Sequence, residues 1–308
     1  MRLVFCGTPQ FAVPTLQALI DAEHEIALVV TQPDRPVGRT QEIVAPPVKQ
    51  LAFSHGLRVL QPEKIKTNAE FRAELEAIAP EVIVVVAYGR IIPKWMLDLP
   101  RYGNINGHAS LLPKYRGAAP IQWAIANGET VTGVTTMLLD EGLDTGAMLL
   151  KHEVPVSPEQ TSVDLFPILA EVGAKLMVET LAGLQAGTIT PQQQDESQAT
   201  LAPILTREDG RIQFAQTAQW NVNRWRGFQP WPGCFTMFRG KKLTAHRMHA
   251  VTGVGEPGAV RIDGDSLMAA CADGTMLVLD EVQLEGKKRM PAADFLHGYQ
   301  VKSGEVLG

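Results

Sequence analysis

Continuous apolar runs alternate with helix-like stretches in the first half of the chain, and this alternation limits the fold to few classes. The apolar runs Leu3–Cys6, Ile26–Val30 and Val82–Ala87 are rich in β-branched residues, which is typical of strands buried on both faces. Between them, Pro14–Ala22 and Val48–His55 carry apolar residues at helical spacing. Strands that alternate with helices in this way indicate an α/β fold with a doubly wound, mostly parallel, Rossmann-like sheet.

The following part of the chain continues the same pattern. Thr132–Leu139 and Met148–Val156 are predicted to be two further strands around a loop, Asp140–Gly146. Thr161 and Asp164 have the spacing of a capping box that begins a long helix.

The character of the sequence changes after residue 187. We predict a catalytic domain over residues 1–187, a polar linker without periodicity over 188–206, and a second domain over 207–308. Short apolar runs separated by glycines predict that the second domain is a small β-barrel. Its expected strands are Phe235–Phe238, Leu243–Ala250, Ala259–Ile262, Leu267–Cys271 and Met276–Gln283, after an amphipathic helix at Ala218–Arg226.

Composition limits the class of protein further. A chain of 308 residues is long enough for about two domains with separate cores. Neither a signal peptide nor an apolar run of membrane-spanning length is recognisable. The three cysteines are far apart, which predicts neither a disulfide framework nor a zinc site. We therefore expect a cytoplasmic protein without a bound metal.

One segment carries polar groups where the predicted sheet ends. Asn106 and His108 lie two residues apart at the carboxyl end of another expected strand, and open α/β sheets bind their ligands at that edge. Asp144 lies on the separate glycine-flanked loop. An amide donor, an imidazole and a carboxylate are the groups needed to move an acyl group onto an amine that attacks directly.

The chemistry of these side chains indicates what each could do. Attack on a carbonyl carbon builds negative charge on its oxygen, which Asn106 can stabilise as a hydrogen-bond donor. His108 donates if it is protonated and relays a proton if it is neutral, while Asp144 can orient the imidazole and accept the proton of the amine. The sequence does not decide how His108 and Asp144 divide this work. A lone histidine beside a strand is more often structural than catalytic, so the assignment depends on the three groups together.

Longer motifs around these residues resemble the folate-dependent formyltransferases. Asn104–Ala119 has the family's pattern of Asn-x-His followed by Ser-Leu-Leu-Pro, and Asp144 stands at its distant aspartate. The resemblance continues from Phe5–Phe11 through Thr31–Arg35 to Gln229–Pro232. It implies the formyltransferase fold followed by an OB-like, tRNA-binding domain. It also implies transfer of a formyl group from 10-formyltetrahydrofolate to the α-amine of methionine on initiator tRNA.

The resemblance also assigns residues to the folate, whose pterin is enclosed by three segments in the family. By this correspondence the folate-binding residues are Tyr88, Gly89, Arg90, Ile91, Ser110, Leu111, Leu112, Pro113 and Asp140. Two assignments have a structural alternative. The segment Leu111–Pro113 could serve only to pack its loop, and Asp140 could form an Asx turn with Gly142 and Gly146 at positive φ. For Asp140 we favour the turn.

The segment from Gln32 to Pro47 is too long and too rich in proline for a simple strand-to-helix connection, and long loops in compact domains are commonly functional. The resemblance makes it the loop that engages the tRNA acceptor end, with Arg35 and Arg39 as contacts. By the same resemblance Phe11 lies near the aminoacyl group.

The chain departs from the family pattern at two places. Thr40, Gln41 and Glu42 stand where members usually carry two lysines after Arg39, which predicts weaker attraction to phosphate. Gly107 stands where members usually carry a larger residue, and we expect it to loosen the catalytic strand end.

Charge gives weak support for an RNA partner. The net charge is −5, but from Arg207 onward there are 13 Lys and Arg against 11 Asp and Glu, whereas the rest has 15 against 22. A locally basic second half is compatible with contact to phosphate, although a solvated surface is the more frequent explanation for any single cation. The candidate cations are Arg224, Arg226, Arg239, Lys241, Lys242, Arg247, Lys287, Lys288 and Arg289, interleaved with Trp220, Trp225 and Phe238.

Other functions remain open at this stage. The same three catalytic residues would serve a formyltransferase acting on glycinamide ribonucleotide or an amino sugar, or a hydrolase of formyl-folate. A non-catalytic RNA- or folate-binding module would not need all three. A NAD-dependent oxidoreductase is disfavoured because the first predicted strand is followed by Gly7-Thr-Pro and not by GxGxxG. We expect a monomer, because the tRNA is bulky.

Overall fold

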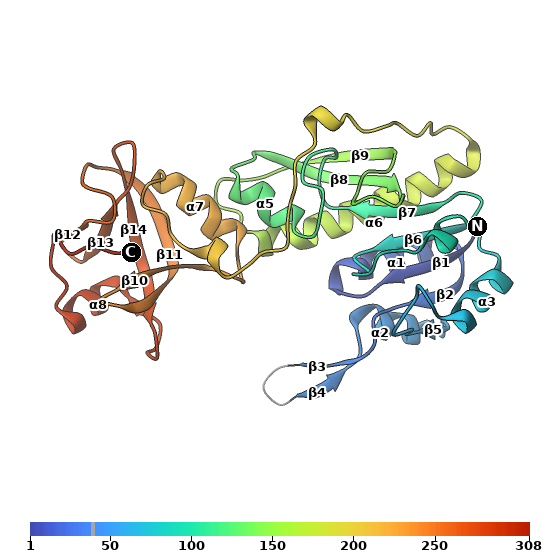
Figure 1. Cartoon of the computed structure of the whole chain (residues 1–308), viewed down its shortest axis with the longest axis horizontal. Helices are drawn as coiled ribbons and strands as arrows, with labels where there is room; N and C mark the ends of the chain where they lie inside the picture. The colour runs from blue at the N-terminus through green and yellow to red at the C-terminus, as the bar shows by residue number, and fades with distance from the viewer. Residues whose placement is uncertain (38–40) are drawn as a thin grey trace. The chain divides into compact units, whose positions relative to one another are not determined.

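The structure is a computed structural model that describes residues 1–37 and 41–308. It divides into two compact units that interleave along the chain (Figure 1). The first unit consists of Met1–Pro120, Val131–Pro155 and Phe166–Ala202, and the second of Ile121–Thr130, Val156–Leu165 and Pro203–Gly308. The domain boundaries expected at residues 187 and 206 stay a prediction.

A seven-stranded sheet forms the centre of the first unit. Its strands are β1 (Arg2–Gly7), β2 (Glu25–Val30), β5 (Val59–Leu60), β6 (Val82–Val86), β7 (Asn104–His108), β8 (Val131–Leu138) and β9 (Met148–Pro155). They lie in the order β5-β2-β1-β6-β7-β8-β9. The first five strands in this order pair in parallel with their neighbours. Strand β8 pairs antiparallel with both β7 and β9. The predicted doubly wound, mostly parallel sheet is therefore confirmed.

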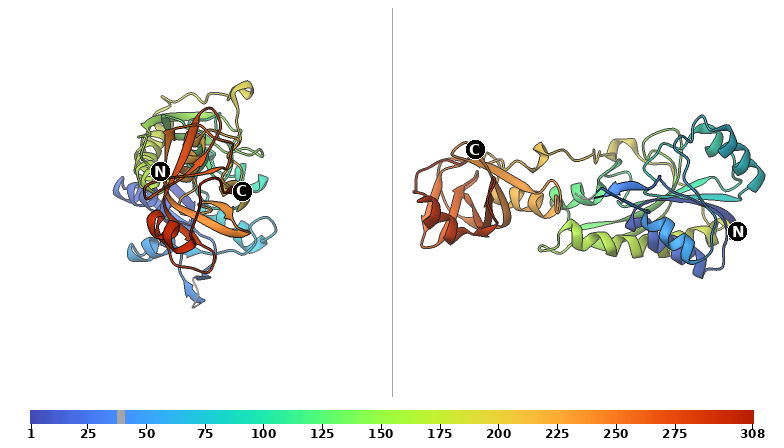
Figure 2. Two further views of the ribbon diagram at one scale, coloured as in Figure 1. Left: turned by 90° about the vertical axis from the view of Figure 1, so that its left-hand side faces the viewer. Right: turned by 90° about the horizontal axis from the view of Figure 1, so that it is seen from below.

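Helices cover both faces of this sheet (Figure 2). On one face, Phe71, Leu75 and Ile78 of α3 (Ala69–Ile78) and Met96 of α4 (Lys94–Leu97) pack against strand residues such as Val85. On the opposite face lies the long helix α6 (Ser162–Ala186), which joins β8 through a 2.8 Å hydrogen bond between the Thr180 and Thr136 hydroxyls. Strands buried by helices on both sides explain why the apolar runs are continuous rather than alternating.

The predicted helix signals are found at α1 (Val13–Asp21), α2 (Pro47–Ser54) and α6. Thr161 and Asp164 form the expected capping box, because the Thr161 backbone N–H donates to Asp164 Oδ2 at 2.9 Å and the Asp164 N–H donates to Thr161 Oγ1 at 3.4 Å. Pro167 lies inside α6, in its second turn, where its missing N–H removes the intrahelical hydrogen bond to the Val163 carbonyl.

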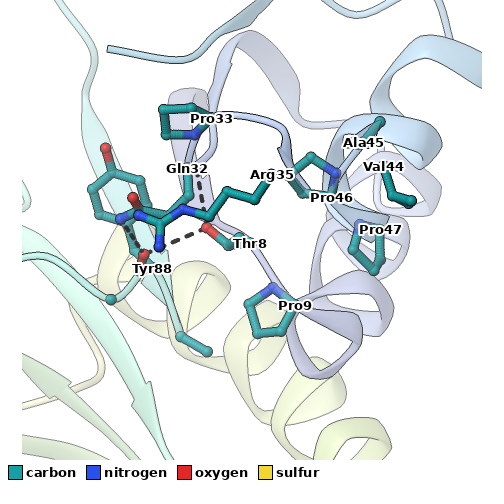
Figure 3. A pocket seen from close by; sticks show the side chains of 12 residues that line it. Thr8, Pro9, Gln32, Pro33, Arg35, Val44, Ala45, Pro46, Pro47 and Tyr88 are labelled. Atoms are coloured by element: carbon teal, nitrogen blue, oxygen red, sulfur yellow. Dashed lines mark hydrogen bonds between the residues drawn. The ribbon is translucent and has the colours of Figure 1, made fainter. Parts of the chain in front are cut away.

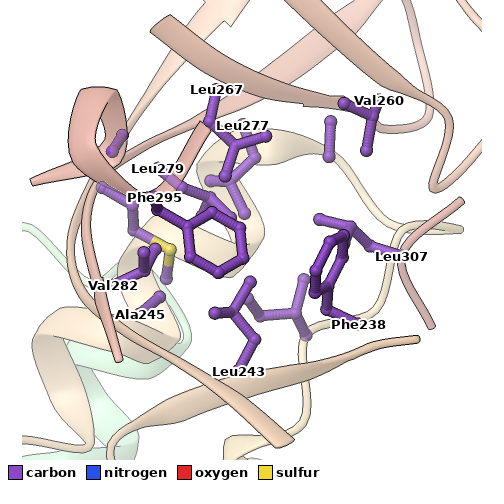
Figure 4. Close-up of a cluster of buried hydrophobic side chains, with 14 of the residues drawn as sticks. Phe238, Leu243, Ala245, Val260, Leu267, Leu277, Leu279, Val282, Phe295 and Leu307 are labelled. Atoms are coloured by element: carbon purple, nitrogen blue, oxygen red, sulfur yellow. The ribbon is translucent and has the colours of Figure 1, made fainter. Parts of the chain in front are cut away.

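A six-stranded antiparallel sheet forms the second unit, as expected for a small barrel. Its strands are β10 (Cys234–Phe238), β11 (Lys241–Thr252), β12 (Val260–Asp263), β13 (Ser266–Ala270), β14 (Thr275–Leu284) and β15 (Met290–Pro291), with helices α7 (Ala218–Gly227) and α8 (Ala292–Tyr299). Phe295 of α8 lies among the core side chains (Figure 4). Its ring contacts Phe238 edge-on at a centroid distance of 5.1 Å, a favourable aromatic geometry.

The last residues of the chain connect the two edge strands of this barrel. The Val260 N–H of β12 donates to Glu305 O at 2.7 Å, and the Gly308 N–H donates to Met237 O of β10 at 3.1 Å. These bonds satisfy backbone groups that an open edge would leave unpaired.

Several elements were not predicted. Sequence reasoning missed α3, the short α4, α5 (Pro120–Ala126), the hairpin of β3 (Arg35–Val37) and β4 (Glu42–Val44), and α8. For α8 a signal exists, because Ala292, Phe295, Leu296 and Tyr299 recur at helical spacing. Within the described residues, no helix is both long and apolar enough to cross a lipid bilayer.

Candidate active site

Strand β7 places Asn106 and His108 on one face of the sheet. Alternation along the strand directs Gly107 to the other face, where a Cβ at this position would lie 3.6 Å from Met177 of α6. Asn106 is half-buried, and within residues 1–37 and 41–308 its amide has no hydrogen-bond partner. A half-buried amide without a protein partner is available to a ligand.

His108 lies between a backbone carbonyl and a carboxylate. Its ring Nε2 is 2.8 Å from Tyr115 O, and its Nδ1 is 3.7 Å from Asp144 Oδ2. A carbonyl oxygen only accepts, so Nε2 carries the hydrogen and donates it to Tyr115. Nδ1 is therefore the ring nitrogen that faces the Asp144 carboxylate. His108 is 6% exposed, so packing and the hydrogen bond to Tyr115 O restrain its ring.

Asp144 is held by one backbone donor and one side-chain donor. The Gly117 N–H donates to Asp144 Oδ2 at 2.8 Å, and the Asp144 carbonyl accepts from Gln194 Nε2 at 2.8 Å. The residue adopts φ of +53°, a left-handed conformation that is uncommon outside glycine. Asn106 and His108 share strand β7, and Asp144 on a separate loop lies close to His108.

The loop that carries Asp144 differs in part from expectation. Asp140 Oδ1 accepts from the Gly142 N–H at 3.0 Å and from Thr145 Oγ1 at 2.7 Å, which supports the Asx turn. The prediction of positive φ at Gly142 and Gly146 is wrong, because Asp144 takes that conformation. Both glycines are needed for space instead: a Cβ on Gly146 would lie 1.8 Å from Leu138 O.

The Ser110–Pro113 segment faces partly into the protein. Ser110 is buried and its Oγ donates to Lys114 O at 2.6 Å, while Leu112 packs with Met137 and Met148. The packing alternative therefore accounts for the side chains of Ser110 and Leu112. Leu111 and Pro113 are half-buried and retain surface for a ligand.

The loop after β6 combines a buried and an exposed part. The Tyr88 ring is buried, which raises the pKa of its hydroxyl, so any folate contact of Tyr88 would involve its backbone. Ile91 is 89% exposed, and Leu143 of the Asp144 loop is 65% exposed. The two loops are neighbours, because Lys94 Nζ lies 3.6 Å from Glu141 Oε1. They offer apolar side chains to a flat ring.

A pocket of about 470 Å³ lies at the carboxyl ends of β1, β2 and β6 (Figure 3). Hydrogen bonds connect the three segments that line it: the Gln32 N–H donates to Thr8 Oγ1 at 3.1 Å, and Gln32 Nε2 donates to Tyr88 O at 3.1 Å. The lining residues are Thr8, Pro9, Gln32, Pro33, Arg35, Val44, Ala45, Pro46, Pro47, Ala87, Tyr88 and Gly89. The pocket thus combines proline-rich walls with one exposed cation, Arg35.

The other expected acceptor residues have different environments. Phe11 is buried, with its ring 5.0 Å from the Phe166 ring, so its side chain packs inside the first unit. Arg39 and Thr40 lie outside the described residues, while Gln41 and Glu42 are exposed.

The base of the hairpin β3–β4 is anchored by a group that sequence reasoning missed. Lys49 Nζ donates to Asp34 Oδ2 at 2.7 Å and to Gln61 Oε1 at 2.7 Å. Hydrogen bonds from Lys49 and Gln61 lower the pKa of Asp34, so the anchor stays charged at neutral pH.

Most candidate cations of the second unit fall into two groups, and the other two, Arg224 and Lys242, are half-buried against the rings of Trp220 and Phe235. Arg226 is buried and donates to Gln160 O and Ser157 O, and Arg239 and Arg289 pair with Glu305 and Glu281. These arginines have structural partners. The exposed cations that remain are Lys241, Arg247, Lys287 and Lys288.

No group of three or more His, Cys, Asp or Glu residues that could hold a metal occurs in the described part of the chain.

Family models match both parts of the chain. The formyl transferase model matches residues 1–181, and the model of the formyl transferase C-terminal domain matches residues 204–300. The chain belongs to the formyl transferase family. It is therefore an enzyme of formyl transfer, and the site built around Asn106, His108 and Asp144 is its candidate catalytic centre.

Similar proteins of known name agree with this assignment. A methionyl-tRNA formyltransferase of Acidobacterium capsulatum is 69% identical over 310 residues, with 100% of both chains covered. One of Koribacter versatilis is 60% identical over 308 residues, covering 100% of this chain and 99% of that one.

Solved structures support the formyltransferase fold. An N-formyltransferase from Helicobacter canadensis, in complex with folinic acid and dTDP-3-aminofucose, has a TM-score of 0.65 at 18% identity, covering 90% of this chain and 98% of that chain. HypX from Aquifex aeolicus, in complex with tetrahydrofolic acid, has a TM-score of 0.61 at 17% identity and covers 100% of this chain and 50% of that chain.

The glycine in the catalytic strand of this formyltransferase gives a stability prediction. A Cβ on Gly107 would make ordinary contacts at 3.6 Å with Met177 and Val86, and its φ lies outside the left-handed region. Because alanine restricts the unfolded chain, Gly107→Ala should raise the free energy of unfolding by about 0.5 kcal/mol. Urea unfolding measures this change, and a destabilised variant would contradict the expected fit. Turnover should stay within about twofold.

Proposed function

We propose that this formyltransferase transfers the formyl group of 10-formyltetrahydrofolate to the α-amine of methionyl initiator tRNA, in the cytoplasm and as a monomer. The observation that carries the catalytic part is the half-buried Asn106 amide without a protein partner among the described residues, on the same strand as His108, whose Nδ1 lies 3.7 Å from Asp144. The names of the relatives at 69% and 60% identity support the choice of acceptor.

The folate supplies the formyl group, and the side chains of the chain supply the rest of the chemistry. Asn106 donates to the formyl oxygen, on which negative charge grows as the amine attacks. The attacking nitrogen loses a proton, which Asp144 accepts with His108 Nδ1 beside it. The new C–N bond to methionine forms first, the bond between the formyl carbon and folate N10 then breaks, and N10 leaves with the proton that Asp144 accepted from the amine.

The described residues fit a folate at the loops next to this centre. Exposed Ile91 and Leu143 offer apolar contacts to a pterin, and Leu111 and Pro113 add half-buried apolar surface. We propose that the segments Tyr88–Ile91 and Ser110–Pro113 and the Asp140 loop hold the pterin, with Tyr88, Ser110 and Leu112 acting through the backbone.

We propose that the acceptor end of the tRNA binds at the Arg35 pocket. The hairpin β3–β4 contributes a wall to this pocket, and Arg35 provides a positive charge for phosphate. Arg39, on the same hairpin loop, is proposed to contact the acceptor as well.

Removing the pocket cation should weaken tRNA binding. At about 0.15 M salt, Arg35→Ala should raise KM for tRNA about fivefold and reduce the slope of log KM against log salt by about one. Turnover at saturating tRNA should change little, because Arg35 is not among the catalytic side chains. Arg101→Ala, a change at an exposed arginine just before β7, is the matched control. An unchanged KM and salt slope in Arg35→Ala would count against a phosphate contact.

The acceptor is tested by offering several substrates to the same enzyme. Purified protein is incubated with 10-formyltetrahydrofolate and methionyl initiator tRNA, methionyl elongator tRNA, glycinamide ribonucleotide or an amino sugar, and formyl transfer is followed. The proposal expects rapid formylation of the initiator tRNA alone. Formylation of a small amine, or release of formate without tRNA modification, would reject this acceptor.

A further inference from the structure

We propose that Gln194 is a positioning residue for Asp144, and that Arg116 fixes the orientation of Gln194. The inference rests on the proposed function, because it assigns Asp144 a catalytic role. Gln194 lies in the segment 188–206, which the sequence indicates only as a polar linker.

Both the nitrogen and the oxygen of the Gln194 side-chain amide form hydrogen bonds within the protein. Nε2 donates at 2.8 Å to the Asp144 carbonyl and at 2.8 Å to the Gly146 carbonyl, while Oε1 accepts from Arg116 Nε at 3.0 Å. Arginine only donates and carbonyls only accept, so the amide can bind in one orientation. Gln194 is 9% exposed, so water does not replace these bonds easily.

Arg116 is itself fixed from two sides. Its guanidinium donates to Glu196 Oε2 at 2.9 Å and Oε1 at 2.7 Å, a bidentate geometry that restrains the planar group. Its backbone N–H donates to Thr200 O at 2.8 Å and its carbonyl accepts from the Ala202 N–H at 2.7 Å. Arg116 is 6% exposed.

The two contacts hold Asp144 at both ends. Gln194 binds its backbone carbonyl, and the N–H of Gly117, the residue after Arg116, binds its carboxylate Oδ2 at 2.8 Å. The left-handed φ of +53° at Asp144 persists where the surroundings determine it. Without Gln194 the two loop carbonyls lose their donor, and the Asp144 carboxylate moves relative to His108.

Loss of the Gln194 side-chain donor should therefore lower kcat. Displacement of a catalytic group by about 1 Å can lower the rate about 100-fold, so Gln194→Ala should reduce kcat about 30- to 100-fold. KM for tRNA and folate should stay within about twofold, because Gln194 is not placed at either binding surface. Gln193→Ala, at the exposed neighbouring glutamine, is the matched control and should keep wild-type turnover.

Gln194→Glu distinguishes positioning from a general packing role. Glutamate has the same size and keeps the acceptor for Arg116, but its carboxylate cannot donate to the Asp144 and Gly146 carbonyls. We expect this variant to fold, with an unfolding midpoint below that of the wild type because the two carbonyls lose their donor, and to retain the loss of kcat. Recovery of wild-type turnover by Gln194→Glu would overturn the proposal, because the contact with Arg116 alone would then suffice.

The decisive experiment is a double-mutant cycle with Asp144→Asn, measured as single-turnover formyl transfer to methionyl initiator tRNA. If Gln194 acts through Asp144, Gln194→Ala should lower the rate less than about threefold in the Asp144→Asn background. A full additional loss in that background would overturn the proposal. The experiment separates a failure of the proposed function from a failure of this inference. A wild-type enzyme that does not formylate methionyl initiator tRNA rejects the proposed function. A wild-type enzyme that formylates it, together with an equally active Gln194→Ala, rejects only the role of Gln194.

Discussion

Asp144→Asn is expected to lower kcat for formyl transfer about a thousandfold, since a positioned acid or base typically contributes about 10²- to 10⁴-fold. The amide is nearly isosteric with the carboxylate, but it can neither accept the proton of the attacking amine nor balance a charged His108 ring. Single-turnover transfer to methionyl initiator tRNA at saturating folate measures this loss.

The same substitution should leave the fold intact. The introduced amide would keep an oxygen that accepts from the Gly117 N–H, which lies 2.8 Å from Asp144 Oδ2 in the wild type, so the free energy of unfolding should change by less than about 1 kcal/mol. Glu141→Gln is the matched control, because it makes the same chemical change on the same loop at an exposed side chain, and its turnover should be normal. Wild-type turnover in Asp144→Asn would remove Asp144 from the mechanism.

Asn106→Ala is expected to reduce kcat about 10²- to 10³-fold, the effect of removing one donor to a developing oxyanion. The amide has no partner in the part of the chain that the structure describes, so the folded protein loses no hydrogen bond. The free energy of unfolding should therefore stay within about 1 kcal/mol of the wild-type value.

Asn104 provides an internal comparison two residues earlier on the same strand. Its Nδ2 donates to Met96 O at 2.9 Å and to Leu97 O at 3.1 Å, and the side chain is buried. Asn104→Ala should lower the free energy of unfolding by about 1–3 kcal/mol with little effect on kcat. If both asparagine variants instead lose stability and activity in the same proportion, the special role of Asn106 is not supported.

The sequence predicted the elements whose signal is local. The runs that became β1, β2 and β6 are apolar at nearly every position because helices bury both faces of the sheet, and Thr161 with Asp164 caps α6 through contacts three residues apart. The candidate site residues could also be proposed from the sequence, because Asn106 and His108 share one strand and belong to a long motif, and their catalytic roles stay a prediction. The proximity of His108 and Asp144 agrees with that interpretation.

Other features depend on contacts that no local pattern encodes. The left-handed φ of Asp144 was expected at the glycines beside it, but those glycines are needed where the Leu138 carbonyl and the Thr145 side chain approach closely. Gln194 contacts Asp144 from 50 positions away, in a segment without periodicity. The interleaving of the two units arises in the same way, because Ile121–Thr130 and Val156–Leu165 pack with residues far along the chain.

The most direct test of the central claim is a crystal structure with 10-formyl-5,8-dideazafolate, a stable analogue that carries its formyl group on N10. The account predicts that the formyl oxygen lies about 2.7–3.1 Å from the Asn106 side-chain nitrogen, with His108 and Asp144 on the side from which the amine arrives. A formyl group bound away from Asn106, or oriented toward a different set of donors, would contradict the account.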